Sequence, residues 1–440
     1  MENTGFKKVM SFKDVMLLMV GGIISTWLYI LPGAMAAVAG ASSLLVWVVG
    51  AVLTIGIGLC CAELATAFPK AGGLGVYPYE ILGRKKSTRA FWSCLAGIGS
   101  FISNLIFVAI TSIMMAEYFN ILVPAARPYT GLIGMLFVVL AFLIVLKGLS
   151  ATESINFGML IMLFVILGVT IITYFSNIKP SNFQPFFLYG TGGFIACLPL
   201  AITSFSAWIN ICCLAEEIHE PEKTIPKAIV WTIILSLIIQ GVIALAVYCV
   251  VNPAEFIAGS SAMAAPLGYV AEKLGYKWLM WLITVSVLPA GFTSVLVGLL
   301  GGSRSLVAMG RYEILPKSFG LISKQGTPWV SLLFLTILSS VFAYFPRSLF
   351  TIIVIGTLVG NLMPYAINLA AFIGLRYFRK DIKPAYRAPM GLVIPVIALI
   401  AIVVGAIGLG SRDWLGSTIA LAIILGYFLI RSLTHSNMLR

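Results

Sequence analysis

Apolar runs of about 20 residues recur along the whole chain and are separated by short polar connections. As a helix, each run is long enough to cross a hydrocarbon core of roughly 30 Å. No small-residue cleavage site follows the first run, so we expect a retained helix rather than a signal peptide. The pattern predicts an all-α membrane protein, one domain over residues 1–440, with spans at 14–39, 44–67, 90–118, 129–147, 155–176, 193–217, 228–251, 276–308, 328–345, 348–376, 391–410 and 414–431.

Composition and charge agree with this class. The chain has 440 residues, of which 60% are hydrophobic and 10% charged, whereas soluble domains carry about 25% charged residues. Most of the 28 Lys and Arg residues lie in alternate connections, on the same side as both termini. Because positive residues stay inside, we expect cytoplasmic termini and a location in the plasma membrane. The net charge of +13 therefore reflects the orientation of the chain in the membrane and gives no support to nucleic-acid binding.

Two of the predicted spans are interrupted at similar depths. The first carries Gly21-Gly22 and Ser25-Thr26 before Pro32, and the sixth carries ITSFSAWIN at 202–210. Broken helices at corresponding places in two halves are typical of transporters built from inverted repeats. Unwound backbone at that depth needs a cavity or protein around it, and the half-helix ends favour a zwitterion. The alternative is close helix packing, in which Gly and Ser are also frequent.

Polar stripes support a wet pathway between helices. Each stripe taken alone is also explained by hydrogen bonding between helices. No Asp, Glu, Lys, Arg or His lies well inside a span, so no proton carrier is visible. We also find no nucleophile–base pair and no metal-ligand spacing, and an enzyme is not expected. The stripes contain Ser93, Gly97, Ser100 and Asn104; Thr203, Ser206 and Asn210; Ser286 and Thr293; and Thr357, Asn361, Tyr365 and Asn368.

Four blocks of sequence resemble the amino acid–polyamine–organocation (APC) superfamily of secondary transporters. They are AELATAFPKAGGLGVYPYEILG after span 2, FSAWINICCLAEEIHEPEKTIPKAI through span 6, GGSRSLVAMGRYEILPKSF with GTPWVS after span 8, and KPAYRAP before span 11. The resemblance implies the LeuT-like APC fold, with twelve helices in a five-plus-five inverted repeat. The repeats would cover approximately 14–176 and 193–376, with helices 1 and 6 broken and two further helices at 391–431.

The resemblance also implies a substrate site between helices 1 and 6. Counting from Pro32 places the helix 1 triplet on Ser25, Thr26 and Trp27, and counting from Ala215 places the helix 6 site on 205–208. We expect Trp27 to narrow or cap the cavity, the alternative being packing against helices 6 and 10. The expected substrate-binding residues are Gly22, Ile24, Ser25, Thr26, Trp27, Ser100, Asn104, Thr203, Phe205, Ser206, Ala207, Trp208, Asn210 and Asn361.

The chain also departs from the family pattern. Both glycines of the helix 1 triplet are replaced, which makes close backbone approach to a carboxylate harder. Ala207 replaces the helix 6 glycine, Ile209 stands where some members have an acidic residue, and Leu163 stands near the helix 5 lysine of proton-coupled members. The adjacent hydroxyls of Thr293 and Ser294 lie where related folds place sodium ligands. No cofactor is expected apart from such a sodium ion.

These observations predict an amino acid permease that works by alternating access. A small neutral amino acid or related amine is the expected substrate, because no acidic residue is available in the cavity to pair a cationic side chain. Transport would proceed by exchange or by ion-coupled symport. The alternative is a transporter-like channel or scaffold subunit without turnover. Expected partners are the small-molecule substrate and the lipid bilayer, with a homo-oligomer left open.

Overall fold

The computed structural model describes residues 6–23, 26–147, 149–257, 261–323, 326–345, 355–410 and 414–434. Within these ranges the regular elements are helices. There is no strand among the described residues, apart from one isolated parallel bridge between Met10 and Ile218. Seven helices are long and apolar enough to cross a membrane, and four shorter apolar helices accompany them in the same described ranges. The chain is therefore a multi-pass helical membrane protein, as its hydrophobic pattern predicts.

Where they are described, most helix bounds lie within four residues of the expected spans, but α7 and α10 begin six and seven residues earlier than expected. The helices are α1 (Phe12–Ile23), α2 (Thr26–Ala39), α3 (Ser43–Ala67), α4 (Val76–Ile81), α5 (Lys86–Leu122), α6 (Thr130–Leu146), α7 (Leu149–Phe175), α8 (Gly190–Ser204), α9 (Ile209–Cys213), α10 (Pro221–Val250), α11 (Ser261–Ala264), α12 (Pro266–Lys273), α13 (Lys277–Arg311), α14 (Trp329–Tyr344), α16 (Met363–Phe378), α17 (Val393–Gly410) and α18 (Trp414–Thr434). A π-helical segment, η9 (Gly356–Leu362), precedes α16.

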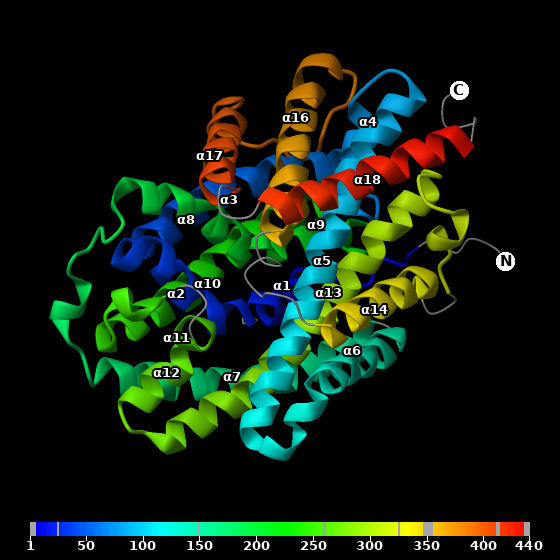
Figure 1. The fold of residues 1–440 in the computed structure, drawn as a ribbon. Coiled ribbons are helices and arrows are strands. Elements are labelled where there is room, and N and C mark those ends of the chain that lie inside the picture. Colours follow the sequence, from blue (N-terminus) through cyan, green and yellow to red (C-terminus); the bar gives the residue numbers. More distant parts are fainter. Residues whose placement is uncertain are drawn as a thin grey trace.

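Two long helices, α5 and α13, run side by side through the middle of the molecule (Figure 1). Glycines of α13 allow this close approach. A Cβ on Gly291 would lie 2.4 Å from Met115, and one on Gly298 would lie 2.7 Å from Val108. Small residues let helix backbones approach in membranes, where the hydrophobic effect does not drive helix association. The α5–α13 pair is therefore the central packing contact around which the other helices are arranged.

The interruption expected at 202–210 is present. Helix α8 ends at Ser204, and a single 3₁₀ turn, Ser206–Trp208, precedes α9. The hydroxyls of Thr203 and Ser204 donate to carbonyls of their own preceding turn, which satisfies acceptors at the helix end. The other expected interruption, in the first span, falls at residues 24 and 25, which lie outside the described residues.

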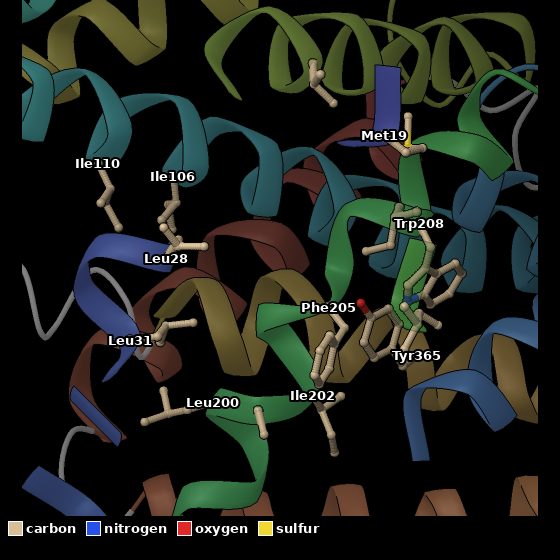
Figure 2. Packing of buried hydrophobic residues seen from close by; sticks show 14 of the residues in the cluster. Met19, Leu28, Leu31, Ile106, Ile110, Leu200, Ile202, Phe205, Trp208 and Tyr365 are labelled. Carbon is tan, nitrogen blue, oxygen red and sulfur yellow. The ribbon is translucent and has the colours of Figure 1, made fainter. Parts of the chain in front are cut away.

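The turn after α8 directs two large side chains into contact with α3 and α16. Phe205 and Trp208 are fully buried. Phe205 meets the edge of Trp47 with ring centroids 5.9 Å apart, and Trp208 stacks on Tyr365 of α16 at 5.4 Å, as Figure 2 shows. These aromatic contacts attach the interrupted segment to α3 and α16.

Candidate functional site

A small cavity lies where the interruption between α8 and α9 meets α1, α2, α5, α13 and η9. Its volume is about 40 Å³. No charged side chain is among the residues that line it. They are Gly22, Trp27, Ser103, Asn104, Ile106, Phe107, Thr203, Ser204, Ser206, Ala207, Ile209, Asn210, Val297, Gly356, Thr357 and Asn361.

The expected site residues divide into three groups. Those that the structure brings to the cavity wall are Gly22, Trp27, Asn104, Thr203, Ser206, Ala207, Asn210 and Asn361. Those that it places elsewhere are Phe205 and Trp208, in the aromatic contacts above, and Ser100, whose side chain is fully buried. Ile24 and Ser25 lie outside the described residues, and Thr26 is the first residue of α2.

Two asparagines from different helices face each other across the glycines of α13. A Cβ on Gly301 would lie 1.7 Å from the side-chain oxygen of Asn210 and 3.4 Å from that of Asn104. Asn104 donates its Nδ2 to the carbonyl of Ser100 at 3.0 Å. The Asn210 oxygen is buried and has no hydrogen-bond partner among the described residues. An unsatisfied buried acceptor is costly, so the packing against Gly301 holds this oxygen in an unfavourable environment.

A third asparagine connects η9 to α5. Asn361 accepts a hydrogen bond from the Ser103 hydroxyl at 3.1 Å. Its Nδ2 donates to the carbonyl of Gly356, five residues earlier, at 2.9 Å. The wider π-helical turn accommodates this contact, and such turns are frequent at functional sites. Ser103 and Thr357 were not among the expected site residues, although Thr357 belongs to a polar stripe that is visible in the sequence.

An aromatic pair forms another part of the cavity wall. The rings of Trp27 and Phe107 stack with centroids 6.2 Å apart and an interplanar angle of 19°, and Ile106 and Val297 lie beside them in the cavity wall. Trp27 therefore lies at the cavity, as expected. Phe107, Ile106 and Val297 were missed, because an apolar residue in an apolar span carries no signal of which way it faces.

The residues of the polar stripes fall into two groups. Thr203, Ser206 and Asn210 all line it. Farther away, hydrogen bonds between helices account for the polar residues. Ser93 donates to the Gly75 carbonyl at 2.6 Å, and Asn368 donates to the Leu74 carbonyl at 3.0 Å. Some stripe residues therefore line the cavity, and others form hydrogen bonds to neighbouring segments.

The two hydroxyls considered for sodium lie behind the cavity, on α13. Thr293 donates to the Gly21 carbonyl of α1 at 3.3 Å and to the Ala290 carbonyl at 3.0 Å. Ser294 also donates to the Ala290 carbonyl, at 2.7 Å. Hydroxyl and carbonyl oxygens are the ligand type that hard cations take. Among the described residues, no group of three or more His, Cys, Asp or Glu could hold a metal ion.

One end of the bundle is closed by buried and half-buried ion pairs. Arg304 of α13 donates to both oxygens of Glu217, at 2.7 and 3.2 Å, and both side chains are at most 4% exposed. Arg311 pairs with Glu216 at 2.7 Å. The ring of Phe6 lies 5.3 Å from the Arg304 guanidinium and 5.6 Å from that of Arg311. The N-terminal segment thus packs over both pairs.

Backbone hydrogen bonds reinforce this closure. The amides of Val9 and Met10 donate to the Glu217 carbonyl at 2.9 and 3.0 Å, and the amide of His219 donates to the Met10 carbonyl at 2.9 Å. The segment leading into α1 is therefore held to the segment that follows α9.

A small, uncharged polar cavity beside an interrupted helix in a multi-pass membrane bundle is typical of solute-transport proteins. The family model described as amino acid permease matches residues 10–430. The chain belongs to the amino acid permease family, within the APC superfamily, and is an amino acid transporter.

Curated relatives agree with this assignment over nearly the whole chain. The branched-chain amino acid permease of Lactococcus lactis subsp. cremoris is 27% identical over 90% of this chain and 88% of its own length. That of Bacillus subtilis is 25% identical over 98% and 94%. The cationic amino acid transporter 8, vacuolar, of Arabidopsis thaliana is 26% identical over 94% of this chain and 71% of its own length. All three names describe transporters.

Proposed function

We propose that this transporter carries a small neutral amino acid, or a related amine, through the cavity by alternating access. The observation that carries the proposal is the uncharged polar cavity beside the interruption between α8 and α9, which Thr203, Ser206 and Asn210 line. We further propose the plasma membrane as its location and cytoplasmic termini, which the distribution of Lys and Arg supports.

The cavity wall favours a neutral substrate side chain. Burying a charged group is costly unless it is paired, and the wall offers no ionisable partner. The small volume of the cavity, about 40 Å³, favours a small side chain. The branched-chain substrates named for two relatives are neutral too. A larger substrate would need the Trp27–Phe107 wall to move.

The helix ends suit the two charges of an amino acid. Trp27 belongs to α2 (Thr26–Ala39), and the N-terminal end of a helix favours a carboxylate. Ser204 is the last residue of α8, where carbonyl groups favour an ammonium group. Both residues line the cavity. We propose that the carboxylate binds near α2, and that the ammonium group binds between the end of α8 and the Asn210 oxygen.

The arrangement of elements supports the inverted repeat. The second proposed repeat begins with the interrupted helix α8–α9, and the first begins with α1 and α2 on either side of residues 24 and 25. In each repeat, short helices follow the second long helix: α4 in the first repeat, and α11 and α12 in the second. The third long helices, α5 with 37 residues and α13 with 35, are the two longest among the described residues. We propose twelve spans in all, with α17 and α18 outside the repeats, and alternating access by movement around the cavity.

Two modes of coupling remain as proposals. In sodium-coupled symport, Thr293, Ser294 and the Gly21 carbonyl would hold the ion, and its charge would stabilise the end of α1 next to the substrate. In ion-independent exchange, one amino acid would leave as another enters. The absence of a mid-membrane carboxylate, lysine or histidine in the sequence speaks against a proton relay.

Transport by purified protein tests the proposal against a channel or scaffold subunit without turnover. The full chain in proteoliposomes should take up a small neutral amino acid with saturable kinetics and release it on exchange. Vesicles with Asn210→Leu protein at equal density should lose most of this uptake. Uptake that is linear in concentration, or absent from the parent with every amino acid and amine tried, contradicts the proposal.

A further inference from the structure

A second hollow lies at the end of α16, away from the transport cavity. Its volume is about 460 Å³, and its walls come from the end of α3, the last turn of α16 and the segment that leads to α17. Four basic residues line it: Arg376, Lys380, Lys383 and Arg387. The proposed transport role makes no use of this hollow.

The charges in the hollow are not balanced. The acidic residue in its lining, Glu63, is 1% exposed. The Glu63 carboxylate accepts its hydrogen bonds from groups of the protein itself. Arg376 donates to it at 2.6 and 3.1 Å, and the Ala388 amide donates at 2.6 Å. Lys380, Lys383 and Arg387 are exposed, and none has a hydrogen bond or ion pair within the described ranges. Three like charges therefore share one hollow without a counter-charge.

The walls of the hollow are fixed before any ligand binds. Arg376 donates to the Ala388 carbonyl at 2.8 Å, and the Tyr386 amide donates to the Thr66 hydroxyl at 3.4 Å. Together with the contacts of Glu63, these bonds hold the 386–388 segment against α3 and α16. An anion that enters would meet positive charge already positioned around it, which lowers the entropy lost on binding.

Large apolar side chains close in sequence to the lining residues are strongly exposed: Tyr377 at 56%, Phe378 at 82% and Met390 at 67%. Aromatic side chains gather at the level of lipid headgroups. Basic pockets at the ends of membrane helices match the phosphates of anionic lipids. A phosphate placed here would leave its acyl chains next to these apolar residues.

We propose that this hollow binds the phosphate group of an anionic phospholipid, through Lys380, Lys383 and Arg387. Free phosphate compounds offer the same charged group, but they would leave the exposed apolar rim without a partner. Each cation near an anionic lipid contributes enough that its removal weakens binding about fivefold. The proposal does not depend on which amino acid the protein transports.

Binding of short-chain lipids to the full-length protein in neutral detergent tests this. The probes are dioctanoyl phosphatidylglycerol, dioctanoyl phosphatidylcholine, glycerol 3-phosphate and inorganic phosphate. The variant is Lys380→Gln/Lys383→Gln/Arg387→Gln. The control, Lys7→Gln/Lys8→Gln/Lys13→Gln, changes the net charge equally at exposed positions near the N-terminus. Each single substitution is also measured, so that the site is tested even if a triple variant folds poorly.

We expect saturable binding of phosphatidylglycerol by the parent and the control. The triple variant should bind it at least tenfold more weakly, and each single variant about fivefold more weakly. Phosphatidylcholine should bind poorly to all of them. Equal binding of phosphatidylglycerol by the parent and the triple variant would overturn the site. Binding of glycerol 3-phosphate or inorganic phosphate as tight as that of phosphatidylglycerol would overturn the assignment to a lipid.

Discussion

The side-chain oxygen of Asn210 lies directly over Gly301, where a Cβ would come within 1.7 Å of it. Asn210 belongs to α9 and Gly301 to α13, so the contact sets how closely the interrupted segment approaches the central helix pair. Asn104 of α5 packs on the neighbouring Gly302, whose Cβ would lie 2.9 Å from that of Asn104. The glycines of α13 thus position both asparagines at the cavity.

Gly301→Ala should reduce uptake strongly, because the added methyl group must displace the Asn210 amide from the cavity wall. Gly241→Ala is the matched control. It lies within α10 with nothing inside 4 Å of an added Cβ, and alanine there should raise helix stability by about 0.5–1 kcal/mol. Initial rates of uptake at matched protein levels compare the two. Equal, unreduced uptake by both variants contradicts the role given to the Asn210–Gly301 contact.

Trp27→Gly should broaden the substrate range towards larger side chains, because the indole and Phe107 together form one wall. If the ring also contacts the ammonium group, affinity for the native substrate should fall up to about 30-fold, which corresponds to a contact of roughly 2 kcal/mol. Competition by a graded series of amino acids measures both effects. The control is Trp231→Gly, at a tryptophan 47% exposed on α10.

Packing alone gives a different result for Trp27. Stability would fall by a few kcal/mol, as for other large-to-small changes, and the order of selectivity would stay intact. A parent-like selectivity order in Trp27→Gly therefore refutes its role in the cavity.

Sodium coupling predicts that replacing sodium by choline lowers uptake at least tenfold. Thr293→Val should then require more sodium for half-maximal uptake, since it removes a hydroxyl directed at the Gly21 carbonyl. Thr284→Val is the control in the same helix, because that hydroxyl bonds only its own turn, at the Met280 carbonyl. Uptake that is equal in choline and depends on amino acid loaded inside the vesicles would leave exchange as the mechanism.

The Arg304–Glu217 pair should matter more to stability than exposed pairs do. Arg304→Met leaves a carboxylate buried without its partner, which costs about 3–5 kcal/mol. Lys223→Met breaks a pair whose side chains are 76% and 65% exposed and should cost about 1 kcal/mol or less. The variants are ranked by the temperature at which monodisperse protein is lost on heating in detergent. Similar melting of the two variants would show that the closure at this end contributes little.

Much of the fold could be predicted from the sequence, because spans in a bilayer follow from the length of apolar runs. The interruption after α8 was predictable as well, since ITSFSAWIN places hydroxyls and an amide in an apolar span. The orientation of individual residues was not. Counting along the family pattern assigned Phe205 and Trp208 to the site, but the 3₁₀ turn directs both rings towards Trp47 and Tyr365.

The remaining site residues depend on contacts between distant parts of the chain. Phe107 and Val297 reach the cavity only because of how α5 and α13 are rotated about their axes. The partners of Glu216 and Glu217 lie 95 and 87 residues away, at Arg311 and Arg304. Sequence spacing within one helix indicates which residues share a face, but it does not indicate which face meets another helix.

Blocking the cavity tests its role as the substrate site most directly. Ala207→Phe would fill the space beside Gly22 and Asn210, whereas Ile238→Phe adds similar bulk at a residue 55% exposed on α10. Binding of glycine, alanine, serine, valine, leucine, lysine and aspartate to each purified protein is measured by isothermal titration. We predict that the parent and Ile238→Phe bind one or more of the neutral amino acids and that Ala207→Phe binds none. Parent-like binding by Ala207→Phe would contradict the assignment of the substrate to this cavity.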